Sequence, residues 1–183
     1  FNAGSALGAN LDAVSAFANT NFASAAAMIA WIFFDMFNKK KMSATGACIG
    51  AVVGLVAITP AAGFVTIGQS IFIGFISAVI SWYAVQIKNK SGLDDTLDVF
   101  PCHGIGGVSG MILTAVFAKD VGLVYGETTV FTHHMIALVC VSVFTFFGSL
   151  LLYKIVDLIT PIRVIEEKEL EGLDLSQHGE SVE

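Results

Sequence analysis

Five long apolar runs constrain the fold of this chain more than any other feature of its sequence. Each run is 17–25 residues long and lacks the strict alternation of a barrel strand. Backbone that crosses a bilayer must satisfy its own hydrogen bonds, so such runs indicate transmembrane helices. We predict five complete spans at approximately Thr20–Phe37, Met42–Ile58, Phe64–Val85, Val99–Ala118 and Thr132–Val156. Residues 1–10 are expected to be the end of an earlier span.

The composition indicates that lipid is the main solvent of the chain. Only 13% of the residues are charged and 55% are hydrophobic, whereas a soluble globular domain carries about 25% charged residues. Polar side chains are too few to cover a surface that faces water. We therefore expect an all-α polytopic protein of the cell membrane whose outer surface contacts lipid.

The net charge of −6 is concentrated at the end of the chain. Residues 163–183 hold seven acidic residues against Arg163 and Lys168, a net charge of −5. The remaining residues carry no basic patch of the kind that binds nucleic acid, so nucleic acid is not expected as a partner. We predict a transmembrane domain over residues 1–162 and an acidic tail over residues 163–183.

Lysine and arginine indicate which side of the membrane each loop occupies. Five crossings place eight of the nine basic residues on one side, and Lys119 alone on the other. Basic loops remain in the cytoplasm. The acidic tail is therefore expected inside the cell, with the loops around Gly63, Lys119 and Glu127 outside.

Small residues in the spans predict close helix packing. Glycines recur at four-residue spacing, which lines one helix face with small residues and lets backbones approach; they are Gly46, Gly50 and Gly54, and then Gly106 and Gly110. The three cysteines, Cys48, Cys102 and Cys140, lie in apolar runs without metal-binding spacing. We expect them to be small buried hydrophobic residues.

His103 is the ionisable residue that the sequence places furthest inside a span. A group of this kind is costly in lipid and by default marks a pathway or a site. The alternative is a core histidine satisfied by a carbonyl of a neighbouring helix. A neutral imidazole offers one acceptor nitrogen, which could take a hydrogen bond from a small N–H species in a narrow, dry pore. The glycines that follow would clear space beside the ring.

Acidic residues precede His103. Pro101 is tolerated near a first helical turn, so we expect a regular helix from about Pro101 onward. Asp94, Asp95 and Asp98 lie just before it, where acids suit the positive end of the helix dipole, and we expect them to cap the start of the helix. A second interpretation is that Asp95 and Asp98 attract cations on the cytoplasmic side.

Four other ionisable residues near span ends are given no role in a site. Asp35 and Asp157 each lie within a turn of a cytoplasmic end and are expected to reach water. His133 and His134 are adjacent, so a helix points them about 100° apart, and a metal pair would need an i,i+4 relation. We expect both histidines at the surface, at the outer mouth of the last span.

Four motifs carry a family resemblance. Residues 1–6 read FNAGSA, residues 55–63 read LVAITPAAG, residues 94–107 read DDTLDVFPCHGIGG and residues 172–180 read GLDLSQHGE. In this order they resemble the sixth-helix motif, the end of the eighth helix, the signature around a pore histidine and the tail signature of the Amt/Rh ammonium transporters. The chain is similar to the C-terminal half of the Amt branch of this family.

The resemblance implies a fold and a site. The family has eleven helices, of which the first ten form two inverted repeats, and it assembles as a homotrimer with one pore per subunit. This chain would hold the end of helix six through helix eleven, including the second inverted repeat, and the tail. By motif match, His103 is one of two facing pore histidines, Phe1 is one of two stacked phenylalanines that gate the outer vestibule, and Ser5 contacts ammonium there.

The resemblance also implies a mechanism. Ammonium would lose a proton at or below the vestibule, and ammonia would then cross an apolar pore past the histidines. Releasing the charge before entering a dry pore avoids a desolvation cost of several kcal/mol or more. The sequence shows no nucleophile–base pair or metal set, so neither enzymatic activity nor a cofactor is expected.

The sequence departs from the family pattern at two points, and two alternative functions remain open. The partner histidine would lie in the family's first half, so this fragment is not expected to conduct alone. Pro101-Cys102 stands where many members have a glycine and an aliphatic residue, which predicts a local backbone difference and not another substrate. One alternative is an ammonium sensor whose tail docks PII-type signal proteins. The other is an Rh-like channel for carbon dioxide, against which Ser5 and the tail favour ammonium.

Overall fold

The computed structural model describes residues 1–38 and 41–181, and this part of the chain is entirely helical apart from its connecting segments. The long helices are α1 (Leu11–Phe37), α2 (Ala44–Ile58), α3 (Ile67–Ser91), α4 (Gly106–Phe117) and α5 (Thr129–Ile159). Single turns are η1 (Gly4–Ala6), η2 (Phe100–Ile105) and η3 (Leu123–Tyr125), and the tail holds α6 (Glu166–Glu171) and η4 (Asp174–His178). The chain divides into two compact units, residues 1–138 and 139–183.

Each of the five predicted apolar segments contains a helix. Four stretches are long and apolar enough to cross a membrane: Leu11–Phe37, Ile67–Ser91, Phe100–Phe117 and Thr129–Ile159. The helix of the remaining segment, α2, is shorter, with 15 residues. The all-helical, membrane-type architecture is therefore confirmed.

The first predicted span begins too late. We expected a helix from about Thr20, but α1 starts at Leu11 because Asn10 caps it, its side chain accepting a 3.0 Å hydrogen bond from Ala13 N–H. Residues 1–10 hold a short 3₁₀ turn that ends with Leu7 in the left-handed region, at φ 53°. This segment is a turn and not a run of α-helix.

Standard capping signals set the other helix boundaries. Ser43 caps α2 by accepting from Gly46 N–H, and Thr66 with Gln69 forms a capping box at the start of α3. Gly92 ends α3 in the left-handed conformation, at φ 70°. Glycine adopts this conformation without the strain of a Cβ atom, which explains why the helix ends here.

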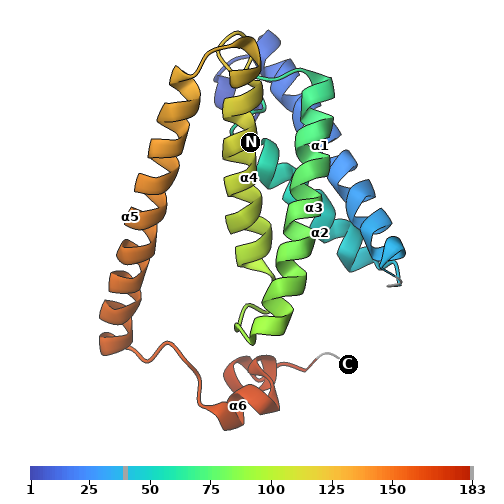
Figure 1. Cartoon of the computed structure of the whole chain (residues 1–183). Helices are drawn as coiled ribbons and strands as arrows, with labels where there is room; N and C mark the ends of the chain where they lie inside the picture. Colours follow the sequence, from blue (N-terminus) through green and yellow to red (C-terminus); the bar gives the residue numbers. More distant parts are fainter. Residues whose placement is uncertain (39–40, 182–183) are drawn as a thin grey trace. The chain divides into compact units, whose positions relative to one another are not determined.

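In the first unit, α1 packs along both α2 and α3, while η2 and α4 lie against α2 and α3 (Figure 1). The contacts are close because small residues face one another. A Cβ atom added at Gly54 would lie 2.5 Å from the carbonyl oxygen of Ala23, and one added at Gly110 would clash with the backbone of Ala57. The predicted glycine-lined packing of these helices is confirmed.

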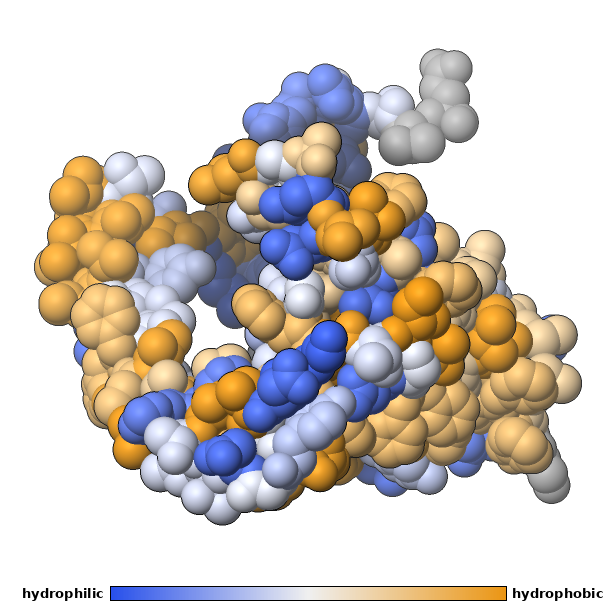
Figure 2. All heavy atoms as spheres, turned by 90° about the horizontal axis from the view of Figure 1, so that it is seen from above, coloured by the Kyte–Doolittle hydropathy of each residue, from blue (hydrophilic) through white to orange (hydrophobic). Residues whose placement is uncertain are grey.

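Large hydrophobic side chains remain at the surface. Figure 2 shows orange, hydrophobic residues over much of the visible surface. Examples from the first unit are Phe22, Phe33, Phe72 and Phe75, all exposed. Exposed apolar surface on this scale is typical of helices that contact lipid.

The cysteine prediction holds at one position of three. Cys102 is buried, but Cys48 and Cys140 are exposed. The prediction was wrong for these two because an apolar helix in a membrane has an outer, lipid-facing surface, so an apolar neighbourhood in sequence does not imply burial.

The second unit holds the later part of α5 and the tail. Asp157 accepts a 3.0 Å hydrogen bond from Ile162 N–H at the end of α5 and is exposed, as expected. In the tail, the guanidinium of Arg163 contacts both carboxylate oxygens of Glu169, at 3.1 and 3.2 Å.

Candidate functional site

A pocket of about 480 Å³ brings the two predicted vestibule residues together. Phe1 and Ser5 both line it, together with Asp12, Gly63 and Phe64. Phe1 is 93% exposed, and Ser5 and Asp12 are also exposed. The pocket therefore combines an aromatic ring, a hydroxyl and a carboxylate, which are groups that attract a small cation with N–H donors.

Local hydrogen bonds hold the segment that carries this pocket. Both the N–H and the hydroxyl of Ser5 donate to the carbonyl of Phe1, at 3.0 and 3.1 Å. Asn2 ties the segment to α1 by donating to the hydroxyl of Thr20 at 3.0 Å. Because the Ser5 hydroxyl uses its proton on Phe1, its oxygen lone pairs remain available to accept from an N–H group.

Asn19 of α1 holds the loop that brings Gly63 and Phe64 to the pocket. Its side chain is 1% exposed, and its amide donates to the carbonyls of Ala62 and Val65, both at 2.8 Å. These carbonyls flank Gly63 and Phe64, which line the pocket. The sequence analysis missed Asn19, although a polar residue inside an apolar helix is a signal for such a role.

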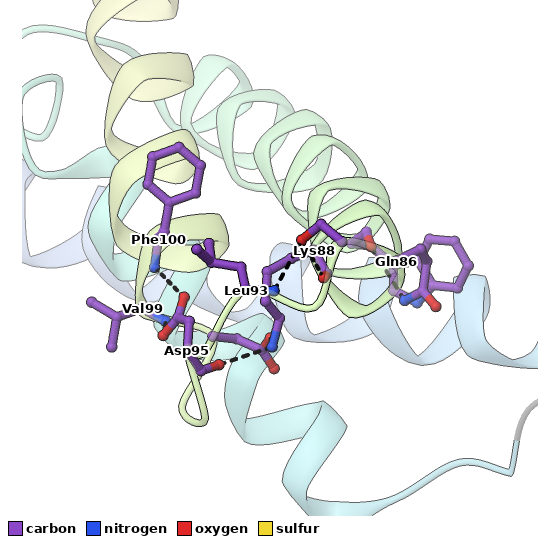
Figure 3. A network of polar contacts seen from close by, with 9 residues as sticks. Gln86, Lys88, Leu93, Asp95, Val99 and Phe100 are labelled. Atoms are coloured by element: carbon purple, nitrogen blue, oxygen red, sulfur yellow. Dashed lines mark hydrogen bonds and ion pairs between the residues drawn. The ribbon is translucent and has the colours of Figure 1, made fainter.

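A second polar cluster lies where α3 ends and η2 begins (Figure 3). The ammonium group of Lys88 lies 2.7 Å from the carboxylate of Asp98 and donates to the carbonyl of Asp95 at 2.8 Å. The Asp95 carboxylate accepts from the N–H groups of Val99 and Phe100, both at 2.9 Å. The predicted capping role is thus confirmed for Asp95.

Hydrogen bonding also shifts the acidity of Asp95. The bond from Phe100 N–H is the main cause that lowers the pKa of Asp95 below its ordinary value of 3.8, with further lowering by Val99 N–H and the charge of Lys88. Desolvation opposes this shift. Asp95 is therefore held as a carboxylate that serves the start of the helix.

His103 lies in η2, a π-helical turn, and not in a regular α-helix. The expectation of a regular helix from Pro101 was wrong, because α4 begins at Gly106. Proline has no N–H to donate and its ring crowds the preceding turn, which favours a locally wider turn. The carbonyl of His103 accepts from Gly106 N–H, and the side chain is exposed in this chain.

The glycines after His103 serve helix packing. A Cβ atom at Gly104 would meet the ring of Phe100 at 3.1 Å, and one at Gly106 would meet the hydroxyl of Ser81 at 3.4 Å. We expected them to clear space beside the imidazole. These distances show that they also admit Phe100 and the neighbouring helices.

The two polar regions lie near opposite ends of α3. Phe64 precedes this 25-residue helix and Lys88 lies in its last turn. At about 1.5 Å per residue, the helix is roughly 37 Å long. His103 is five residues beyond Asp98 and does not line the pocket of Phe1 and Ser5. The described residues therefore form a pocket around Phe1 and Ser5 and a separate histidine-bearing turn.

Asp35 corrects another expectation. It does not reach water freely: it is 8% exposed and accepts a 2.9 Å hydrogen bond from the indole N–H of Trp82. Its place near a helix end suggested solvent access, but α1 packs against α3 at this point. A long-range pair of this kind cannot be read from sequence spacing.

The adjacent histidines differ. His133 is exposed as expected, whereas His134 is partly buried, with Nδ1 3.4 Å from the carbonyl of Met111 on α4. His134 is therefore less exposed than expected.

Comparison with known proteins decides the family. A family model described as the Ammonium Transporter Family matches residues 1–183. The chain belongs to the ammonium transporter family. It is 46% identical to the ammonium transporter of Bacillus subtilis over 98% of this chain and 46% of that protein. It is 37% identical to the ammonium transporter Amt1 of Archaeoglobus fulgidus over 98% of this chain and 47% of that protein.

Solved structures show the same fold in this family. The crystal structure of Candida albicans Mep2 matches 91% of this chain and 40% of its own, with a TM-score of 0.84 and 30% identity. A structure described as a sensor Amt protein matches 96% of this chain and 44% of its own, with a TM-score of 0.82 and 27% identity. The chain spans about half the length of the curated relatives it matches.

Proposed function

We propose that this chain is part of a protein that passes ammonium or ammonia across a membrane. The observation that carries this proposal is the family match over all 183 residues, with a transporter relative 46% identical over 98% of the chain. The apolar helices and the outer pocket of Phe1, Ser5 and Asp12 agree with such a function.

The finer architecture is also a proposal. The turn η1 would end helix six, and α1, α2, α3, η2 with α4, and α5 would be helices seven to eleven, with the second inverted repeat among them. The lysine and arginine distribution supports a cytoplasmic tail. The complete protein would be a homotrimer, and residues from its other half would be needed for conduction.

Ammonium would first bind in the outer pocket. The Ser5 oxygen can accept from an N–H of ammonium, the Phe1 ring can attract its charge, and the Asp12 carboxylate adds negative potential. The proton would leave before the pore, because desolvating a full charge costs several kcal/mol or more. Potassium has no proton to lose and would be excluded.

His103 would act as a pore residue. An exposed imidazole on η2 can face a lumen completed by other helices of the complete protein, and a neutral ring nitrogen can accept from ammonia. Asp95 and Asp98 would have a smaller part in attracting cations at the cytoplasmic side, since both carboxylates are already engaged by backbone N–H groups or by Lys88.

The test is ammonium-evoked current from the full-length protein in liposomes. Wild type should give a current that potassium does not elicit, and His103→Ala should lose this current or its discrimination. His133→Ala is the matched control, because His133 is exposed on another helix. Equal currents from wild type and His103→Ala would refute the pore role of His103.

A sensor is the second candidate, favoured by the similarity to a sensor Amt protein. In that case the tail, with α6 and η4, would bind cytoplasmic partners such as PII-type signal proteins in a way that depends on ammonium. Wild-type protein that passes no ammonium, but whose tail binds a PII-type protein in an ammonium-dependent way, would support the sensor over the transporter.

A further inference from the structure

We propose that Lys88 is a positioning residue for His103: it clamps the start of η2 to the end of α3 and thereby sets where the imidazole lies. This inference rests on the proposed function, because it concerns the residue assigned to the pore. Lys88 itself would touch no substrate.

The clamp has two contacts at its Lys88 end. The ammonium group lies 2.7 Å from an Asp98 carboxylate oxygen and donates to the Asp95 carbonyl at 2.8 Å. The side chains of Lys88 and Asp98 are 11% and 18% exposed. A pair so well shielded from water is screened little by salt, and removing one partner leaves a charge without compensation.

The clamp continues into the π turn through Asp95. While its carbonyl is held by Lys88, its carboxylate accepts from Val99 and Phe100 N–H, both at 2.9 Å. Figure 3 shows Lys88 and the Val99–Phe100 backbone reaching Asp95 from opposite sides. Asp95 thus links the Lys88 side chain of α3 to the N–H groups at the start of the next helical segment.

The backbone at Asp98 needs such support. Asp98 has φ 53°, a left-handed conformation that non-glycine residues rarely adopt and that persists where surroundings hold it. Its carbonyl accepts from Cys102 N–H at 3.0 Å, and Cys102 is the residue directly before His103. Release of the Asp98 carboxylate would therefore free the backbone that leads directly to His103.

Lys90 provides a matched comparison. It lies two residues further on α3, carries the same charge, is exposed, and makes no polar contact with the other described residues. A general effect of positive charge at this helix end would be shared by Lys88 and Lys90. If Lys88 acts as a clamp, only the substitution of Lys88 should have an effect.

The experiment compares Lys88→Met, Lys88→Arg and Lys90→Met in the full-length protein. Hydrogen–deuterium exchange of peptides covering residues 96–106 reports the clamp, and liposome currents report ammonium against potassium. Lys88→Met should exchange about tenfold faster in this segment, because a hydrogen-bonded start of a helix is released. It should also lose discrimination against potassium, with an unchanged half-saturating ammonium concentration, since the outer pocket lies at the other end of α3.

Further variants separate positioning from loss of folding. Lys88→Arg should restore both readouts, because a guanidinium can reach the same acceptors. Lys88→Met with Asp98→Asn removes both charges and keeps a residue type that tolerates the left-handed conformation at this position, so it should fold, yet it should keep fast exchange and poor discrimination.

Exchange and discrimination in Lys88→Met equal to those of Lys90→Met would overturn the proposal. If exchange accelerates while discrimination stays intact, Lys88 clamps η2 but does not position a pore residue, and the inference about His103 fails. If wild type passes no ammonium, the proposed function fails on its own, whatever the exchange data show.

Discussion

The carboxylate of Asp35 accepts a 2.9 Å hydrogen bond from the indole Nε1–H of Trp82, and both side chains are buried. The bond joins the last turns of α1 to the second half of α3 across 47 residues of sequence. Burying a carboxylate is costly unless donors compensate it, so this pair is a condition for the close packing of the two helices.

Trp82→Phe should therefore destabilise the protein by about 1–3 kcal/mol, the usual cost of leaving a buried acceptor without its donor. Unfolding in detergent, followed by a fluorescent dye, measures the change. Tyr83→Phe is the control: it removes a polar group from the next residue, which is exposed. Equal losses in both variants would show that the indole N–H is dispensable.

Gly110→Ala should cost about 1–3 kcal/mol, because overpacking a tight contact forces the backbones apart. The added methyl group would clash with the backbone of Ala57 on α2. Gly107→Ala in the same helix should be tolerated, since its Cβ atom would meet Val56 at an ordinary 3.9 Å. Thermal unfolding of the two variants compares them directly, and the prediction fails if Gly107→Ala is the more damaging.

Asn19→Leu should lower stability by about 2 kcal/mol or more, because two buried carbonyls lose their donor. The same change should raise the half-saturating ammonium concentration of the full-length protein, since the released carbonyls of Ala62 and Val65 flank two pocket residues. Asn21→Leu is the matched control, as Asn21 is exposed and bonds only within its own helix, to Phe17. If Asn19→Leu leaves the half-saturating ammonium concentration unchanged, the loop of Ala62 and Val65 does not influence ammonium binding in the pocket.

The stability that Asp95 contributes as a helix cap should be lost at low pH. A carboxyl whose pKa is lowered by folding contributes stability above its ordinary pKa, here 3.8, and loses it as pH falls through the lower folded value. The stability difference between wild type and Asp95→Asn should thus be constant between about pH 7 and pH 5, and shrink below about pH 3.8. Melting temperatures of both proteins at each pH measure it. If the stability difference between the two proteins already shrinks near neutral pH, a group other than the Asp95 carboxyl is responsible for it.

Several features could be predicted from sequence because they depend on local chemistry. The apolar runs predicted the helices, since a span must satisfy its own backbone bonds over the thickness of a bilayer. The acids before Pro101 predicted a cap that Asp95 provides. The motifs around Phe1, His103 and Gly172 predicted the family, because they are contiguous residues in a fixed order.

Other features were missed or wrong because they depend on partners distant in sequence. Asp35 was expected in water, yet Trp82 and the packing of α3 on α1 bury it. Cys48 and Cys140 were expected in the core, yet they face outward. The π turn at His103 was expected to be α-helix, because a helical pattern in sequence does not distinguish the two geometries.

The sequence by itself thus determined the helical segments and the family, because spans and motifs are set by neighbouring residues. Only the tertiary structure decided that Lys88 reaches both Asp95 and Asp98, and that Asn19 braces the loop beside Phe1 and Ser5. The physical reason is that a hydrogen bond or ion pair requires its two atoms within a few ångströms. The packing of α1, α2 and α3 creates that proximity between residues far apart in the chain.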